Sequence, residues 1–130
     1  MADNFKNRLT NVNPKGHTQD KLKPYPLKRV KGLLKSGHYK INENALISAE
    51  EDFNWGPAEI MKCLLKLNSR HYVDDKKKNH YYKTEAHTQF PNTKMDYYKA
   101  EKIMEGFNIY THFYISPSGD TLVISSFKEL

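Results

Sequence analysis

The side chains best suited to chemistry lie in the last third of the chain, where aromatic residues recur at the spacing of a β-strand. In the segment 107–115, Asn108, Tyr110, His112 and Tyr114 occupy alternate positions and share one face of the predicted strand. The intervening residues are mostly apolar, so we expect the face with tyrosine and histidine to point outward. Phenol and imidazole groups exchange protons, and their rings stack on nucleic-acid bases.

A lysine joins the tyrosines on another predicted strand. Tyr81 and Lys83 lie two residues apart in the segment 80–84 and therefore share a face. A sheet surface that carries tyrosine, histidine and lysine suits stacking on bases and neutralising phosphates. Tyrosines on half-exposed sheets also occur without any ligand, so the pattern alone leaves both interpretations open.

The elements that must position these residues are three helices followed by a series of strands. Apolar periodicity and end signals predict helices at 26–36, 42–53 and 57–67, and strands at 80–84, 95–100, 107–115 and 121–127. Both alternating sets of the last strand contain apolar residues, which predicts a central position in the sheet. The predicted fold class is α+β, with N-terminal helices packed on a C-terminal antiparallel β-sheet.

Positive charge is concentrated at the start of the chain. The 130 residues carry a formal net charge of +6, and residues 1–35 hold nine lysines and arginines against two acids. Residues 1–24 contain few apolar residues, which predicts a flexible basic arm ahead of a single domain at 25–130. The arm is interpreted either as an RNA contact or as a solubilising tail, and the overall charge favours a polyanionic partner.

Several classes of protein do not fit this sequence. Cys63 is the only cysteine and cannot form an internal disulfide, and we interpret it as a buried thiol. The six histidines show no metal-ligand spacing and no glycine-rich phosphate loop is present, so we expect neither a metal nor another cofactor. Apolar runs are too short for a membrane span and no secretory signal is expected, which favours the cytoplasm.

Four motifs resemble, in the same order, those of the MqsR toxins. They are Leu27-Lys28-Arg29-Val30-Lys31-Gly32-Leu33-Leu34-Lys35-Ser36-Gly37, Asn44-Ala45-Leu46, Tyr82-Lys83, and Leu122-Val123-Ile124-Ser125-Ser126-Phe127-Lys128-Glu129. MqsR toxins are mRNA interferases of bacterial type II toxin–antitoxin systems with a RelE-like microbial ribonuclease fold. The resemblance implies a metal-independent endoribonuclease that cleaves mRNA at short G–C-containing sequences. It also implies a cognate antitoxin of the MqsA kind, which can bind zinc.

The resemblance also implies catalytic residues. Lys83 and Lys128 match the family's lysines and would clamp the phosphate, and Tyr110 matches its tyrosine as proton donor or orienter. Met95 stands where the family has glutamine, and His112 is our additional candidate acid or base. A strand-edge lysine at 83 and a solvated terminal lysine at 128 are the structural alternatives. We assign RNA contacts to Tyr81, Tyr98, Lys99 and Tyr114.

Two other functions fit the same sequence. A non-catalytic RNA-binding module would use the arm and the sheet face to bind without cutting. A protein-interaction domain would instead use its tyrosine-rich strands as an edge for pairing with a partner. The arm and the segment 73–79 are additions relative to the MqsR pattern, and neither has an assigned role.

Overall fold

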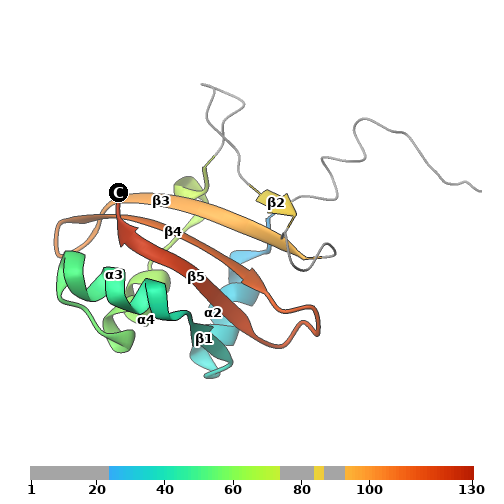
Figure 1. The fold of residues 1–130 in the computed structure, drawn as a ribbon. Coiled ribbons are helices and arrows are strands. Elements are labelled where there is room, and N and C mark those ends of the chain that lie inside the picture. Colours follow the sequence, from blue (N-terminus) through green and yellow to red (C-terminus); the bar gives the residue numbers. More distant parts are fainter. Residues whose placement is uncertain (1–23, 74–83, 87–92) are drawn as a thin grey trace, which may run out of the picture.

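The computed structural model describes residues 24–73, 84–86 and 93–130, with the backbone alone for 84–86. The elements are α2 (Leu27–Lys35), β1 (Tyr39–Ile41), α3 (Glu43–Phe53), α4 (Pro57–Leu64), the 3₁₀ turn η1 (Ser69–His71), β2 (Thr84–Ala86), β3 (Lys94–Met104), β4 (Phe107–Ile115) and β5 (Leu122–Glu129). These α-helices lie on one face of the sheet (Figure 1). The α+β class predicted from the sequence is therefore confirmed.

The helices begin and end close to the predicted signals. Helix α2 follows Pro26 and is followed by Gly37, whose φ of 81° is a left-handed conformation that glycine adopts without strain. The extended backbone of Asn42 precedes α3. Helix α4 ends at Leu64, three residues earlier than predicted, and a turn then carries the chain to Leu67, which is still buried.

The sheet is mixed, which corrects the prediction that it is antiparallel. Its strand order is β1-β5-β4-β3-β2, so β5, predicted to be central, is an inner strand next to the middle strand β4. The pairs β2–β3, β3–β4 and β4–β5 are antiparallel, whereas β1 pairs parallel with β5. The sequence did not indicate β1, because three residues are too few to show an alternating pattern.

A bulge in β5 decides which of its side chains face outward. The pairing with β4 passes over Ser125 between Ile124 and Ser126, so this strand holds one extra residue there. Strict alternation would place Lys128 on the same face as Ile124. The bulge instead places Phe127 with Ile124 in the core, both fully buried, and leaves Lys128 exposed.

The core fills the space between the sheet and the helices. Its fully buried side chains include Val30, Leu34, Ala45, Ile60, Leu64, Ile109, Phe113, Leu122, Ile124 and Phe127. Aromatic rings pack together at one end of the core, where the centre of the Phe53 ring lies 4.7 Å from that of Trp55 and 4.9 Å from that of Phe107. Cys63 is also buried, and burial raises the pKa of its thiol to about 12. This thiol is therefore protonated at neutral pH and unsuited to nucleophilic attack.

A buried carboxylate joins the start of the described chain to β3. Asp96 is completely buried, and its Oδ2 accepts a hydrogen bond of 2.7 Å from the backbone N–H of Tyr25. The Tyr25 hydroxyl donates to the backbone carbonyl of Lys94 over 2.9 Å. These bonds tie the segment before α2 to the strand that carries part of the candidate site.

Some predicted features lie outside the described residues. They are the arm, nearly all of the segment 73–79 and most of the predicted strand 80–84. Among the helices that the structure does describe, none has the length and apolar character needed to cross a membrane.

Candidate functional site

Pairing of the three long strands brings five outward side chains together. Tyr97 on β3 lies opposite His112 on β4, and Lys99 lies opposite Tyr110. Tyr110 in turn lies opposite Lys128 on β5. Directly opposed residues have Cβ atoms about 4.5–5.5 Å apart, so the five side chains are neighbours on one surface. We call these five residues the outer cluster.

Tyr110 is at the centre of the contacts within the outer cluster. Its hydroxyl lies 3.3 Å from Nδ1 of His112, and the tautomer of the imidazole decides which of the two groups donates. The Nζ atom of Lys128 lies 5.3 Å from the centre of the Tyr110 ring, a distance at which an ammonium group is attracted to the π-electrons. The Tyr110 hydroxyl therefore contacts an imidazole that can exchange protons, and the Tyr110 ring contacts the ammonium group of Lys128.

The ring of Tyr97 supports the imidazole from the neighbouring strand. It meets the ring of His112 edge to face, with centres 4.8 Å apart and planes at 84°. Its centre is 6.3 Å from that of the Tyr110 ring. Two aromatic side chains therefore restrict where the imidazole can lie.

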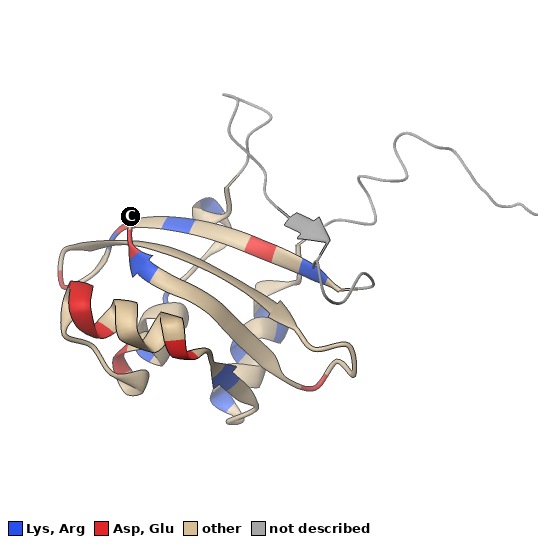
Figure 2. Cartoon of the chain, viewed as in Figure 1, with Lys and Arg blue, Asp and Glu red and all other residues tan. Residues whose placement is uncertain are grey.

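The outer cluster is both ordered by packing and open to a ligand. Tyr97, Tyr110 and His112 are half-buried, and Lys99 and Lys128 are exposed. The α-helices lie on the other face of the sheet, so no helix of the described residues covers this one (Figure 1). The cluster contains two lysines and no carboxylate, and Figure 2 shows basic positions on β3 and near the end of β5. Such a surface attracts an anion.

The structure places together three of the four side chains predicted to be catalytic. Tyr110, His112 and Lys128 meet in the outer cluster through neighbouring strands. Lys83, the fourth, lies outside the described residues, as does Tyr81. Their positions relative to the cluster therefore stay predictions.

The RNA contact predicted for Tyr98 is corrected by the structure. Tyr98 is only 2% exposed and faces the helices, where its ring stacks on Phe113 at 5.3 Å. Burial raises the pKa of its hydroxyl, and the nearby charge of Asp96 raises it further. The side chain belongs to the core, so its ring cannot stack on a base.

Tyr97 is the residue of the cluster that the sequence analysis missed. In the pair Tyr97–Tyr98 the two side chains point to opposite faces, and the buried Asp96 shares the inner face with Tyr98, which leaves Tyr97 outside. Of the other residues predicted to bind RNA, Lys99 belongs to the cluster. Tyr114 is half-buried on the same strand face as His112, opposite Val123.

No family model matches the chain, and no curated protein matches its sequence. The function must therefore be inferred from the site itself.

The outer cluster suits acid–base chemistry on an anion. Within the described residues, histidine, cysteine and carboxylate side chains nowhere gather in a group of three that could hold a metal ion. The cluster itself offers a phenol, an imidazole and ammonium groups. These groups can accept a proton, donate one and stabilise the negative charge of a phosphate.

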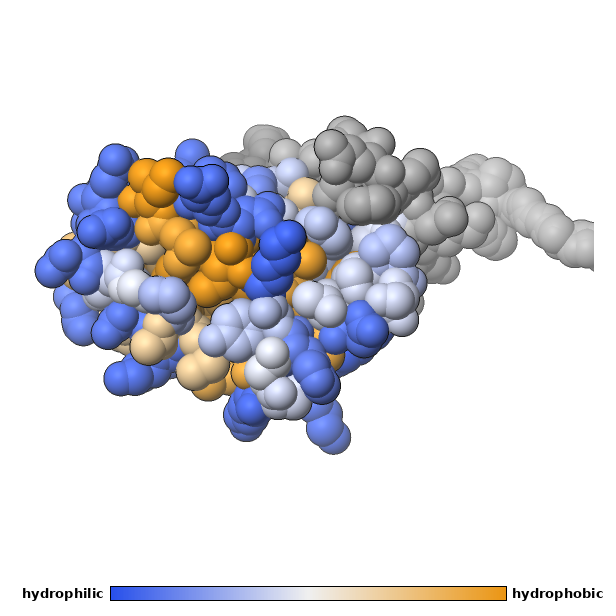
Figure 3. All heavy atoms as spheres, turned by 60° about the horizontal axis from the view of Figure 1, so that its bottom comes forward, coloured by the Kyte–Doolittle hydropathy of each residue, from blue (hydrophilic) through white to orange (hydrophobic). Residues whose placement is uncertain are grey.

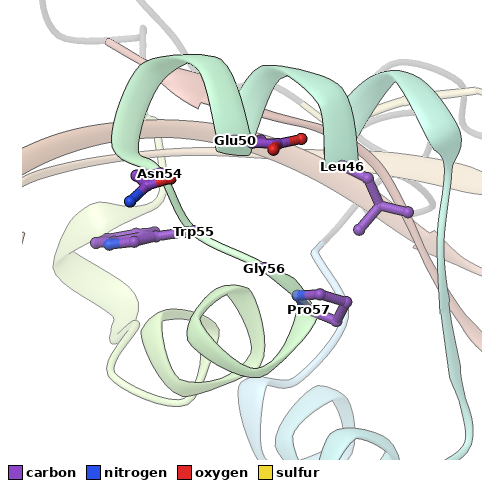
Figure 4. A pocket seen from close by; sticks show the side chains of 6 residues that line it. All are labelled: Leu46, Glu50, Asn54, Trp55, Gly56 and Pro57. Atoms are coloured by element: carbon purple, nitrogen blue, oxygen red, sulfur yellow. The ribbon is translucent and has the colours of Figure 1, made fainter.

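A pocket on the helical side has a different character. It has a volume of about 380 Å³ and lies between α3 and the α3–α4 connection, lined by Leu46, Glu50, Asn54, Trp55, Gly56 and Pro57 (Figure 4). Figure 3, which turns the helical layer forward, shows apolar surface on that side of the molecule, and Ile47, which follows the lining residue Leu46 in α3, is 47% exposed. Glu50 is the only charged residue of this lining, so the pocket does not suit a phosphate ligand.

Proposed function

We propose that this chain is the toxin component of a type II toxin–antitoxin system, a metal-independent endoribonuclease related to MqsR. It would have the RelE-like form of the α+β class and cleave cytoplasmic mRNA at short G–C-containing sequences. The observation that carries the proposal is the meeting of Tyr110, His112 and Lys128 on the open face of the sheet. Lys83, Tyr110 and Lys128 are the residues that match the catalytic pattern of the MqsR toxins.

The reaction needs a base, an acid and positive charge. The 2′-hydroxyl oxygen of a ribose attacks the adjacent phosphorus and loses its proton to the base. The bond from phosphorus to the 5′-oxygen breaks, and that oxygen receives a proton from the acid. The products are a 2′,3′-cyclic phosphate and a 5′-hydroxyl end, and negative charge builds on the phosphate oxygens in between.

The outer cluster supplies candidates for each part. The ammonium group of Lys128 would stabilise the phosphate in the transition state, together with that of Lys83. The Tyr110 phenol, in contact with the His112 imidazole, would transfer or orient the proton. Lys99 lies opposite Tyr110 on β3 and would contact a neighbouring phosphate.

The resemblance also supports a protein partner. We propose that an antitoxin of the MqsA kind binds this chain and suppresses cleavage, and that a neighbouring reading frame encodes it. Purifying the two proteins together tests this, and the expected result is a complex that no longer cleaves RNA.

The deciding experiment is to identify the ends of the products on a defined single-stranded RNA in the presence of EDTA. We expect cleavage with cyclic phosphate ends, a strong loss of rate in Lys128→Ala, and no loss in Lys62→Ala, which removes an exposed lysine of α4. RNA binding without cleavage would replace the proposal with a non-catalytic RNA-binding module. Absence of RNA binding at physiological salt would favour a protein-interaction domain.

A further inference from the structure

Helix α2 presents a row of lysines apart from the outer cluster. Lys28, Lys31 and Lys35 are spaced at i, i+3 and i+7, so their side chains lie along one side of the helix. Lys28 and Lys35 are exposed, and Lys31 is half-buried because it borders the face that buries Val30 and Leu34. We call the three lysines the α2 row.

Arg70, from the 3₁₀ turn η1, adds to the same positive field. The pKa of His71 is lowered by burial and, in addition, by the charges of Arg70 and Lys31. The positive charges of Arg70 and Lys31 therefore act on the same imidazole, although one residue belongs to η1 and the other to α2. Nδ1 of His71 accepts a hydrogen bond of 3.1 Å from the backbone N–H of Asn68, so the neutral ring carries its proton on Nε2.

The positive charge of the α2 row is not balanced by its own segment. Residues 24–41 contain five basic residues and no acidic one. Like charges at i, i+3 and i, i+4 destabilise a helix, so this arrangement costs stability unless an anion binds. Four of the five acidic residues of the described α-helices lie on α3, at Glu43, Glu50, Glu51 and Asp52, and the fifth is Glu59 on α4 (Figure 2).

Two further cations, Lys94 and Arg29, meet at the Tyr25 ring, where the start of β3 lies next to α2. Nζ of Lys94 lies 4.5 Å from the centre of the Tyr25 ring, and the guanidinium carbon of Arg29 lies 6.0 Å from it. Lys94 begins β3 and precedes Tyr97 by three residues, which corresponds to about 10 Å along the strand. The odd spacing turns the Lys94 side chain to the helical face, opposite to Tyr97. An anionic polymer that leaves the outer cluster along β3 would therefore pass around the end of the sheet to meet Lys94 and Arg29 next to α2.

We propose that the α2 row and Arg70 bind the phosphate backbone of single-stranded RNA outside the cleaved linkage. The choice of RNA as the polyanion rests on the proposed function. The outer cluster would bind the nucleotides that react, and the α2 row would add affinity for a long strand. A short RNA that fills only the outer cluster would not reach α2.

Binding is tested with an RNA that cannot be cleaved. The probe is a single-stranded RNA of roughly 30 nucleotides with 2′-O-methyl groups throughout, long enough to extend beyond a single binding site. Lys28→Gln/Lys35→Gln removes two exposed charges of the row, and Lys62→Gln/Lys66→Gln removes two exposed charges elsewhere as the matched control. Glutamine and lysine have similar helix propensities, so we expect both variants to fold.

The salt dependence of affinity gives the expected difference. Each phosphate contact to a single strand contributes about 0.7 to the slope of log affinity against log salt, so the row variant should lower the slope by about 1.4. The control variant should keep the wild-type slope. An equal slope and affinity in the row variant, the control and the wild type would overturn the inference.

Cleavage of a short RNA separates this inference from the proposed function. On a substrate of roughly six nucleotides the row variant should cleave at the wild-type rate, because the outer cluster is intact. If the wild type cleaves no RNA but the slope still falls in the row variant, the nuclease proposal fails and the binding surface stands. If the row variant loses cleavage of the short substrate, the row belongs to the reaction site and this inference is wrong.

Discussion

At the scale of single residues, the contact between Tyr110 and His112 is the feature most directly tied to chemistry. The Tyr110 hydroxyl lies near the imidazole of His112, and the ammonium group of Lys128 lies over the Tyr110 ring. A hydroxyl in this position can pass on a proton, while the ring keeps its packing. Removing the hydroxyl and removing the ring should therefore have different effects.

Tyr110→Phe should reduce RNA cleavage by about 10²–10⁴-fold, the usual contribution of a group that transfers a proton. The aromatic ring remains, so Lys128 keeps its contact with the ring and stability should change little. Single-turnover cleavage rates and thermal unfolding measure the two effects. A rate within twofold of the wild type would remove Tyr110 from the proposed reaction.

Asp96→Ala should destabilise the fold, because the backbone N–H of Tyr25 would lose its buried acceptor. Hydrogen bonds to charged groups contribute about 1.5–3 kcal/mol, which is the loss we expect in the free energy of unfolding. Urea denaturation measures it. Asp96→Asn keeps an acceptor oxygen and should lose less, and equal losses in the two variants would contradict this account.

At the scale of elements, the sequence predicted the helices and the long strands well and their side-chain faces less well. Strand β4 has the predicted bounds, because nine residues alternate without interruption. On β3 the assignment of Tyr98 as an RNA contact was wrong, and the local pattern is misleading there because Asp96 is polar and yet buried. Its burial depends on the N–H of Tyr25, a contact across 71 residues that no local pattern reveals.

The outer cluster was only partly predictable for the same reason. Alternation within β4 alone predicts that Tyr110 and His112 share the outer face. The position of Lys128 depends on the bulge at Ser125, and strict alternation would have turned this lysine toward the core. Tyr97 joins the cluster through the register of β3 against β4, which is set by pairing between strands and not by the strand's own sequence.

Leu34→Ala tests how firmly α2 is fixed to the sheet. Leu34 is 1% exposed, and truncation of a buried leucine costs about 2–5 kcal/mol of unfolding free energy. Leu33→Ala, at a half-buried position of the same helix, should cost less. Urea denaturation of the two variants measures the difference, and equal losses would show that the helix packs differently.

At the scale of the whole molecule, burial of weakly acidic groups makes stability depend on alkaline pH. The thiol of Cys63 has its pKa raised by burial to about 12. Burial likewise raises the pKa of the Tyr98 hydroxyl. The unfolded chain exposes both groups and loses their protons at lower pH than the folded chain does.

Stability should therefore be fully present below about pH 8.5, the ordinary pKa of cysteine, and decline as the pH rises above it. The decline for one group reaches about 1.4 kcal/mol per pH unit, and the Tyr98 hydroxyl adds to it above about pH 10. Urea denaturation between about pH 7 and 10 measures this. Cys63→Ala should flatten the first part of the decline, and an unchanged profile would contradict the assignment.

The separation of acidic α3 from basic α2 gives the described part of the molecule an electric polarity. In the field of a nucleic acid such a body turns before contact, because one end is drawn in and the other is pushed away. Early collisions would then present α2 to the strand more often than chance alone. The association rate constant should fall steeply as ionic strength rises.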